Sequence, residues 1–256
     1  MRVTIFNEYL HEVESDVVHA IYPEGIHAVL GEAITRLAGA DVSYATLRED
    51  EHGLTQQVID ATDVLFWWGH KAHDQVADAV VERVQRAVLG GMGLVALHSA
   101  HYSKPFQKLL GTNASLRWRE ADEKERLWNL QPSHPLMAGV PDYFELEREE
   151  MYGERFDVPD PDELLMLSWF QGGDVFRSLA TWRRGHGTVV YFRPGHETYP
   201  TYYDPNVQRV IANAAGYAAA RVRRPDVGSP EAEPLEPVPN AGKEHILRVT
   251  LGEGEA

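Results

Sequence analysis

Histidine side chains that could do chemistry stand near the ends of several short apolar runs. His70 and His98 each follow such a run almost directly, and His196 comes soon after another, with Glu197 beside it. Neutral imidazole binds transition metals, and it accepts or donates protons near neutral pH. The sequence therefore predicts a site of metal binding or acid–base chemistry built from these positions.

The segment around His98 has the composition of a sharp turn from a strand into a helix. Such an elbow needs small residues on either side of its tip, because the tip side chain must stand clear of the backbone. Ala96 and Ala100 flank His98 in this way, whereas Ser99 has bulkier neighbours. We expect His98 at the tip, as a metal ligand or an acid–base group rather than a covalent nucleophile.

Composition excludes several classes of protein. The chain has 256 residues, of which 43% are hydrophobic and 25% charged, as is typical of one large α/β domain. Its formal charge of −15 argues against binding to nucleic acid or to an anionic membrane surface. It has no cysteine, which excludes thiolate catalysis and cysteine-ligated zinc. With no leader-like segment and no long apolar run, we expect a cytoplasmic protein.

Strands and helices are expected to alternate through the first half of the chain. Short apolar runs predict strands at 3–6, 42–47, 64–68 and 94–97. Helical spacing of apolar residues predicts helices at 28–37, 55–61 and 75–89. The long polar segment 7–25 is typical of a functional loop. This alternation indicates βαβ units and a mostly parallel sheet.

The second half is expected to be richer in strands. Shorter and more polar strands are predicted at 116–120, 126–130 and 143–149, and further strands at 164–170, 178–183 and 188–192. A hairpin turn is expected at 183–187 and a closing helix at 207–220. We predict one domain over residues 1–222 and a Pro- and Glu-rich extended tail over 223–256. Residues 244–251 of that tail could pair as an edge strand on a neighbouring subunit, which favours a homo-oligomer.

The sequence resembles the trehalose-utilisation, or ThuA-like, family over residues 3 to 219. The resemblance rests on residues 3–9 with His11, and on 68–70, 97–101, 150–152 and 195–197. The family is similar in fold to class I glutamine amidotransferases, which implies a flavodoxin-like doubly wound α/β sheet, mostly parallel, with an added β-rich insertion. Those enzymes use an elbow cysteine, which His98 replaces here, so the resemblance does not imply amidotransferase activity. It implies a role in the use of trehalose and related disaccharides, by way of keto-sugar intermediates.

We interpret the histidine cluster as the site of a metal-dependent sugar enzyme. A divalent ion, zinc or manganese, beside a keto-sugar would polarise the carbonyl and acidify the neighbouring C–H. Metal ligands are expected at His11, His98, His101 and His196. Catalytic groups are expected at His98, His196, Glu197 and Glu154, with Glu150 as the alternative to Glu154. Substrate contacts are expected at Asn7, Glu8, His70, Arg117 and Tyr152, although Arg117 also fits the exposed face of a strand.

Two other functions stay open. The first is a metal-free hydrolase in which Ser99 is the nucleophile, His196 the base and Glu197 the group that orients it. The second is a sugar-binding or regulatory protein without catalysis. In each case the expected partner is a small sugar.

Overall fold

The structure is a computed structural model that describes residues 1–219, 222–224 and 228–239. The chain divides into two units, Met1–Pro225 and Asp226–Ala256. The architecture below is that of the first unit. The strand expected at 244–251 lies outside the described residues.

One sheet of nine strands organises the first unit, in the order β2-β1-β3-β4-β9-β8-β7-β5-β6. The strands from β2 to β9 in this order are parallel, and those from β9 to β6 are antiparallel. The parallel strands are β1 (Arg2–Asn7), β2 (Asp41–Thr46), β3 (Val64–Trp68), β4 (Gly93–Leu97) and β9 (Gly187–Phe192). The antiparallel extension contains β5 (Arg117–Asn129), β6 (Tyr143–Gly153), β7 (Glu163–Phe170) and β8 (Val175–Arg184). This arrangement confirms the predicted flavodoxin-like parallel sheet with a β-rich insertion.

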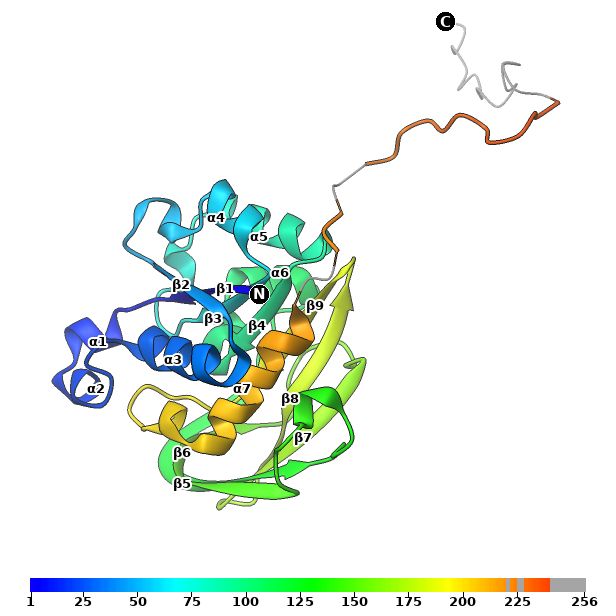
Figure 1. Cartoon of the computed structure of the whole chain (residues 1–256). Helices are drawn as coiled ribbons and strands as arrows, with labels where there is room; N and C mark the ends of the chain where they lie inside the picture. The colour runs from blue at the N-terminus through cyan, green and yellow to red at the C-terminus, as the bar shows by residue number, and fades with distance from the viewer. Residues whose placement is uncertain (220–221, 225–227, 240–256) are drawn as a thin grey trace, which may run out of the picture. The chain divides into compact units, whose positions relative to one another are not determined.

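Helices cover both faces of the parallel strands (Figure 1). One face carries α3 (Ile26–Ala38) and α7 (Pro205–Ala218), and the other carries α4 (Gln56–Ala61), α5 (Asp78–Leu89) and α6 (Lys104–Leu110). Alternate side chains of β3 enter the two cores: Phe66 and Trp68 pack with α3 and α7, whereas Leu65 and Trp67 pack with α5 and α6. All five residues of β3 are buried, so this strand reads as an unbroken apolar run.

Residues 7–25 contain two short helices, where the sequence predicts a loop. They are α1 (His11–Glu14) and α2 (Asp16–Ile21). The Ser15 hydroxyl caps α2 by accepting a hydrogen bond from the Val18 N–H. Val18 is the buried residue of α2, so its apolar stripe is too narrow to show as a helical period in the sequence.

The two strands expected at 116–120 and 126–130 form the single strand β5. Its pairing with β6 shifts register twice, between Arg119 and Glu123 and between Glu123 and Glu125. Asp122, inside this segment, has a positive φ of 52°. Such bulges let a strand continue through a polar stretch and bend as it does so. The polar residues between the two expected strands are therefore the bulged part of one strand.

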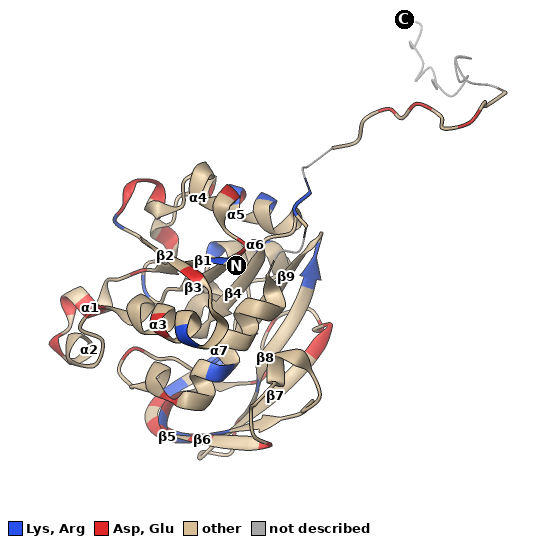
Figure 2. Cartoon of the chain, viewed as in Figure 1, with Lys and Arg blue, Asp and Glu red and all other residues tan. Residues whose placement is uncertain are grey.

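Basic residues are spread over several elements in the view of Figure 2, which shows no continuous basic band among the described residues. Within the part of the chain that the structure describes, no helix has both the length and the apolar character needed to cross a bilayer.

Candidate functional site

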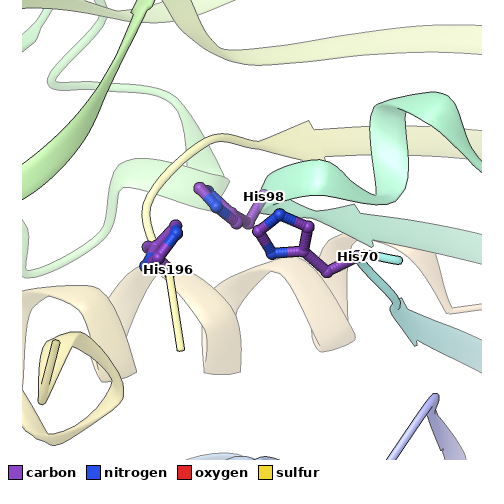
Figure 3. A group of neighbouring side chains, drawn as sticks. All are labelled: His70, His98 and His196. Carbon is purple, nitrogen blue, oxygen red and sulfur yellow. The ribbon is translucent and has the colours of Figure 1, made fainter. Parts of the chain in front are cut away.

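Three histidines meet at the carboxyl ends of neighbouring parallel strands. His70 follows β3, His98 follows β4, and His196 follows β9. Their ring centroids are 5.3 Å apart for His70 and His196, 5.4 Å for His98 and His196, and 6.0 Å for His70 and His98. One ring nitrogen from each lies within 4.8 Å of the others. The rings converge from three directions on one small volume (Figure 3).

His98 stands at the sharp elbow that the small neighbouring residues predict. Its φ is 51°, a left-handed conformation that costs a residue other than glycine about 1–3 kcal/mol. The Tyr191 hydroxyl donates to the His98 carbonyl at 3.0 Å, and His98 Nδ1 lies 3.0 Å from the Arg193 carbonyl. The two contacts tie the elbow to β9 and hold the ring in place.

Hydrogen bonds at Nδ1 determine which nitrogen His70 and His98 offer to a ligand. His98 Nδ1–H donates to the Arg193 carbonyl, and His70 Nδ1–H donates to Glu197 Oε2 at 2.8 Å. With the proton on Nδ1, each ring keeps its lone pair on Nε2. This is the arrangement found around metal-binding histidines, whose second nitrogen is oriented by a carbonyl or a carboxylate.

A glycine and a threonine position His196. A Cβ at Gly195, which has a φ of 129°, would lie 2.0 Å from the Tyr202 hydroxyl, so no larger residue fits there. Trp68 Nε1–H donates to the Gly195 carbonyl at 3.1 Å. His196 Nδ1 lies 2.8 Å from Thr198 Oγ1 and 3.3 Å from the Thr198 N–H. The Thr198 N–H can only donate, so Nδ1 accepts and the proton of the neutral His196 ring is on Nε2; ligation through Nε2 requires the other tautomer.

Glu150, on β6, brings a carboxylate to the three histidines. Its Oε2 lies 3.1 Å from His98 Nε2 and 4.0 Å from His196 Nε2. This oxygen is buried, and it has no aligned hydrogen bond among the described residues. Burial raises the pKa of Glu150, and the nearby histidines and Arg193 offset this only in part. A buried oxygen without a partner beside three imidazoles fits a site that receives a cation or a proton.

Burial sets the protonation of the histidines. It lowers the pKa of His98 well below its usual value, that of His101 to about 3 and that of His196 to about 4. Burial acts in the same direction on His70, but the hydrogen bond and charge of Glu197 outweigh it and raise the pKa of His70. At neutral pH, His98, His101 and His196 are therefore neutral and keep a lone pair for ligation.

Two of the three convergent histidines, His70 and His196, line a cavity of about 630 Å³, whereas His98 is fully buried and is not among the lining residues. The residues that line it are His70, His73, Ser99, His101, Tyr102, Ser115, Leu116, Trp118, Glu120, Glu150, Tyr152, His196, Glu197 and Thr198. Tyr152, an expected substrate contact, stacks on His98 with ring centroids 5.0 Å apart and an interplanar angle of 13°. The cavity is large enough for a small sugar.

The other expected metal ligands lie beside the three convergent histidines. His101 lines the cavity and its Nδ1–H donates to the Ala114 carbonyl at 2.7 Å, but it is not in the group of ring nitrogens that lie within 4.8 Å of one another. His11 Nδ1 lies 3.2 Å from Glu197 Oε1, while its buried Nε2 has no partner among the described residues. His11 thus belongs to a second group, with His70 and Glu197.

Asn7 and Glu8 are not among the residues that line the cavity, and they contact the segments that carry the site residues. The Glu8 carboxylate accepts hydrogen bonds from the backbone N–H groups of His70, at 2.7 Å, and Lys71, at 3.1 Å. Asn7 Nδ2 donates to Glu12 at 2.7 Å, on the buried side of α1. Glu8 therefore positions the loop that presents His70, and Asn7 positions α1.

Glu154 and Arg117 lie outside the cavity lining. The Glu154 carboxylate pairs with Arg177, at 2.9 Å to Nε and 3.0 Å to Nη2, and accepts the Phe156 N–H at 2.8 Å. Arg117 Nε donates to the Glu154 carbonyl at 2.8 Å, and its side chain is largely exposed. Of the two glutamates that the sequence offers for this role, the structure brings Glu150 to the histidines.

Replacing Glu154 with glutamine is expected to destabilise the fold in a pH-dependent way. Burial would raise the pKa of Glu154, but hydrogen bonds from Arg177 and two backbone N–H groups outweigh it, and the pKa is lowered. Its contribution is therefore present above the unfolded pKa of about 4.3 and is lost as the pH falls through the lower folded pKa. We expect Glu154→Gln to lose about 1 kcal/mol in urea unfolding at pH 7 and much less at pH 3. An equal loss at both pH values would contradict this role.

Arg193 is the residue at this site whose role the sequence does not reveal. It lies fully buried after β9, ion-paired with Glu125 and, at 3.1 Å, with Glu149. Its Nη1 also donates to the Glu150 carbonyl at 2.8 Å, while its own carbonyl accepts from His98. An arginine directly after an apolar strand is the available signal, because a charge at that depth needs partners.

Comparisons with known proteins give the family. The sequence matches the family model of ThuA, trehalose utilisation, over residues 2–218. Similar structures include a ThuA-like protein of Bacteroides uniformis, with a TM-score of 0.63, 14% identity, and 87% of this chain and 92% of that chain covered. A cytoplasmic protein of Salmonella typhimurium has a TM-score of 0.58 and 14% identity, with 86% of this chain and 100% of that chain covered. A β-galactosidase of Bacillus circulans sp. alkalophilus has a TM-score of 0.50 and 12% identity, with 90% of this chain and 32% of that chain covered.

These structural likenesses concern the fold alone, given their low identities. A search of curated proteins finds no match. The family match covers most of the chain, as the motifs around the histidines predict. The chain therefore belongs to the ThuA, or trehalose-utilisation, family.

Proposed function

We propose that this protein is a metal-dependent enzyme of sugar metabolism, with one divalent ion held by His70, His98 and His196. The observation that carries the proposal is the convergence of three ring nitrogens within 4.8 Å at the ends of β3, β4 and β9. In this ligand set His70 takes the place that the sequence predicts for His11 and His101.

The donor set favours zinc over manganese. Three neutral imidazoles with a nearby carboxylate suit zinc, whereas manganese prefers sites richer in oxygen. The Nδ1 hydrogen bonds of His70 to Glu197 and of His98 to the Arg193 carbonyl would keep the rings oriented without the ion. Three protein ligands also leave coordination positions open for the oxygens of a sugar.

The chemistry that suits this site is proton removal next to a sugar carbonyl. A zinc ion there would polarise the carbonyl of a keto-sugar and acidify the adjacent C–H. Glu150 is the group placed to take the proton, because it lines the cavity and its Oε2, which has no aligned hydrogen bond among the described residues, lies beside His98 and His196. The outcome is isomerisation, epimerisation or elimination.

The family and the similar structures support a proposal for the substrate and the location. The family description supports a disaccharide related to trehalose or its keto form as the substrate. The similar Salmonella protein, described as cytoplasmic, supports the same location for this chain. The Ser99 hydroxyl donates to the Gly69 carbonyl at 2.9 Å, which does not favour a serine nucleophile acting with His196.

Metal analysis of variants tests the ligand set. We expect untagged protein to hold about one equivalent of zinc by inductively coupled plasma mass spectrometry. His70→Ala and His98→Ala should lose it, whereas His101→Ala should keep most of it. His186→Ala, an exposed residue of the β8–β9 turn, is the matched control. No metal in the wild type after incubation with zinc or manganese would refute the proposal and favour a sugar-binding protein.

A further inference from the structure

Leu116 and the first residues of β5 present alternate side chains to opposite sides. Leu116, Trp118 and Glu120 line the cavity beside the histidines. Arg117 and Arg119, between them, are not among the lining residues. This is the alternation of a β-strand, in which successive side chains leave opposite faces. The aromatic ring of Trp118 and the carboxylate of Glu120 therefore line the cavity, whereas Arg117 and Arg119 leave the opposite face of the strand.

The two arginines form hydrogen bonds and ion pairs with other residues of the protein. Arg117 donates to the Glu154 carbonyl at 2.8 Å and lies 3.6 Å from Asp174. Arg119 pairs with Glu123 and, at 2.9 Å, with Asp174. Neither guanidinium is available to an anion inside the cavity.

Trp118 is a large apolar side chain without a cover. It is 65% exposed, although it belongs to the cavity wall. In the β5–β6 ladder it pairs with Tyr152, whose ring stacks on His98. Cross-strand partners lie about 5 Å apart on one face of the sheet. Trp118 therefore offers a flat surface about one sugar ring further from the histidines than Tyr152.

The charged residues of the cavity wall are acidic. Glu120, Glu150 and Glu197 line it, and no lysine or arginine is among the described residues that do. Phosphate and carboxylate groups are bound in proteins by arginine, lysine or a helix N-terminus. Three carboxylates also outnumber the two positive charges of a divalent ion. The wall can accept hydrogen bonds from sugar hydroxyls, but it repels anions.

Building on the proposed function, we propose that the cavity selects uncharged sugars over phosphorylated or carboxylated ones, and that Trp118 and Glu120 set this selectivity. Trp118 stacks on the sugar ring that lies beyond the metal ligands. Glu120 accepts hydrogen bonds from hydroxyls of that ring and repels an anionic group in their place. The two residues act on the same ring because they lie two positions apart on one face of β5.

Calorimetric titration of the zinc-loaded protein tests this, with trehalose and sucrose each compared with its 6-phosphate. We expect the neutral sugars to bind at least about tenfold more tightly than the phosphates. Trp118→Ala should weaken neutral binding by about tenfold, and Trp118→Phe by much less. Glu120→Lys should remove or reverse the preference against phosphate, and Glu120→Gln should reduce it. Arg117→Ala, one residue away on the opposite face, is the matched control and should change neither affinity.

The outcomes separate this inference from the proposed function when zinc is measured in the same samples. Equal or tighter binding of the phosphates, or no binding of either neutral sugar, would overturn the selectivity. The zinc content of the same samples would still test the proposed metal site independently. Unchanged neutral binding in Trp118→Ala would also overturn it. Selective binding of neutral sugars by a protein without zinc would support the selectivity and refute the metal enzyme.

Discussion

Replacing Arg193 with methionine is expected to destabilise the folded protein by about 3–5 kcal/mol at pH 7. The guanidinium is fully buried and pairs with two fully buried carboxylates, Glu125 and Glu149. Without it, both carboxylates would stay buried with no counter-charge. The measurement is the free energy of unfolding in guanidinium chloride.

The pH dependence of the Arg193→Met loss has a definite sign. Burial already raises the pKa of Glu125 and of Glu149 against the pull of Arg193, and the variant would raise both further. A group with a raised folded pKa contributes stability below its unfolded pKa, about 4.3 for Glu, and loses it as the pH rises. The variant should therefore come closer to wild type at pH 5 than at pH 8.

Two controls make the Arg193 result specific. Arg126 and Glu145 form a partly exposed ion pair between β5 and β6, so Arg126→Met should cost less than about 1 kcal/mol. Adding Glu125→Gln and Glu149→Gln to Arg193→Met removes the stranded charges and should restore part of the stability. If the loss of unfolding free energy in Arg193→Met is small or independent of pH, the ion pairs of Arg193 with Glu125 and Glu149 do not stabilise the fold as proposed.

Replacing Glu150 with glutamine is expected to lower the rate of proton exchange in a keto-sugar by about 10²–10⁴-fold. Glutamine fills the same volume but cannot accept the proton, whereas the three histidines remain in place. The measurement is exchange of C–H for C–D in keto-disaccharides in D₂O, followed by proton NMR. Zinc content should stay near that of wild type.

Glu154→Gln is the matched control for Glu150→Gln, because it is the same substitution four residues away and outside the cavity lining. It should leave the exchange rate within about twofold of wild type, since its carboxylate pairs with Arg177. Full exchange in Glu150→Gln would exclude Glu150 as the base and transfer that role to another group, with His196 the first to test. Exchange lost together with zinc would assign Glu150 to metal binding instead.

The sequence could predict that His70, His98 and His196 follow strand ends at one edge of the sheet, although it assigns His70 to the substrate, because their placement depends on one rule of parallel sheets. The carboxyl ends of parallel strands share one edge, so residues that follow β3, β4 and β9 must come together. The positions of His11 and His101 depend on local hydrogen bonds after the strands end, to Glu197 and to the Ala114 carbonyl. No spacing in the sequence encodes those contacts.

The antiparallel extension was harder to predict because its side chains depend on strand register. A shift of one residue exchanges the two faces of a strand, and β5 has two register shifts of its own. This parity decides that Trp118 rather than Arg117 faces the cavity. Glu150 and Glu154 have the same parity, but β6 ends at Gly153, and the chain then carries Glu154 to Arg177.

The position of β9 between β4 and β8 would link loading of the proposed metal ion to the completion of the fold. His70 and His98 are close in sequence, but His196 arrives only after the chain has built β5, β6, β7 and β8 and returned to pair with β4. Such long-range pairing is the slow part of forming a sheet. The nascent chain therefore cannot offer the full set of three imidazoles to an ion. A bound ion would hold β4 and β9 together, the last parallel pair before the antiparallel extension begins with β9 and β8.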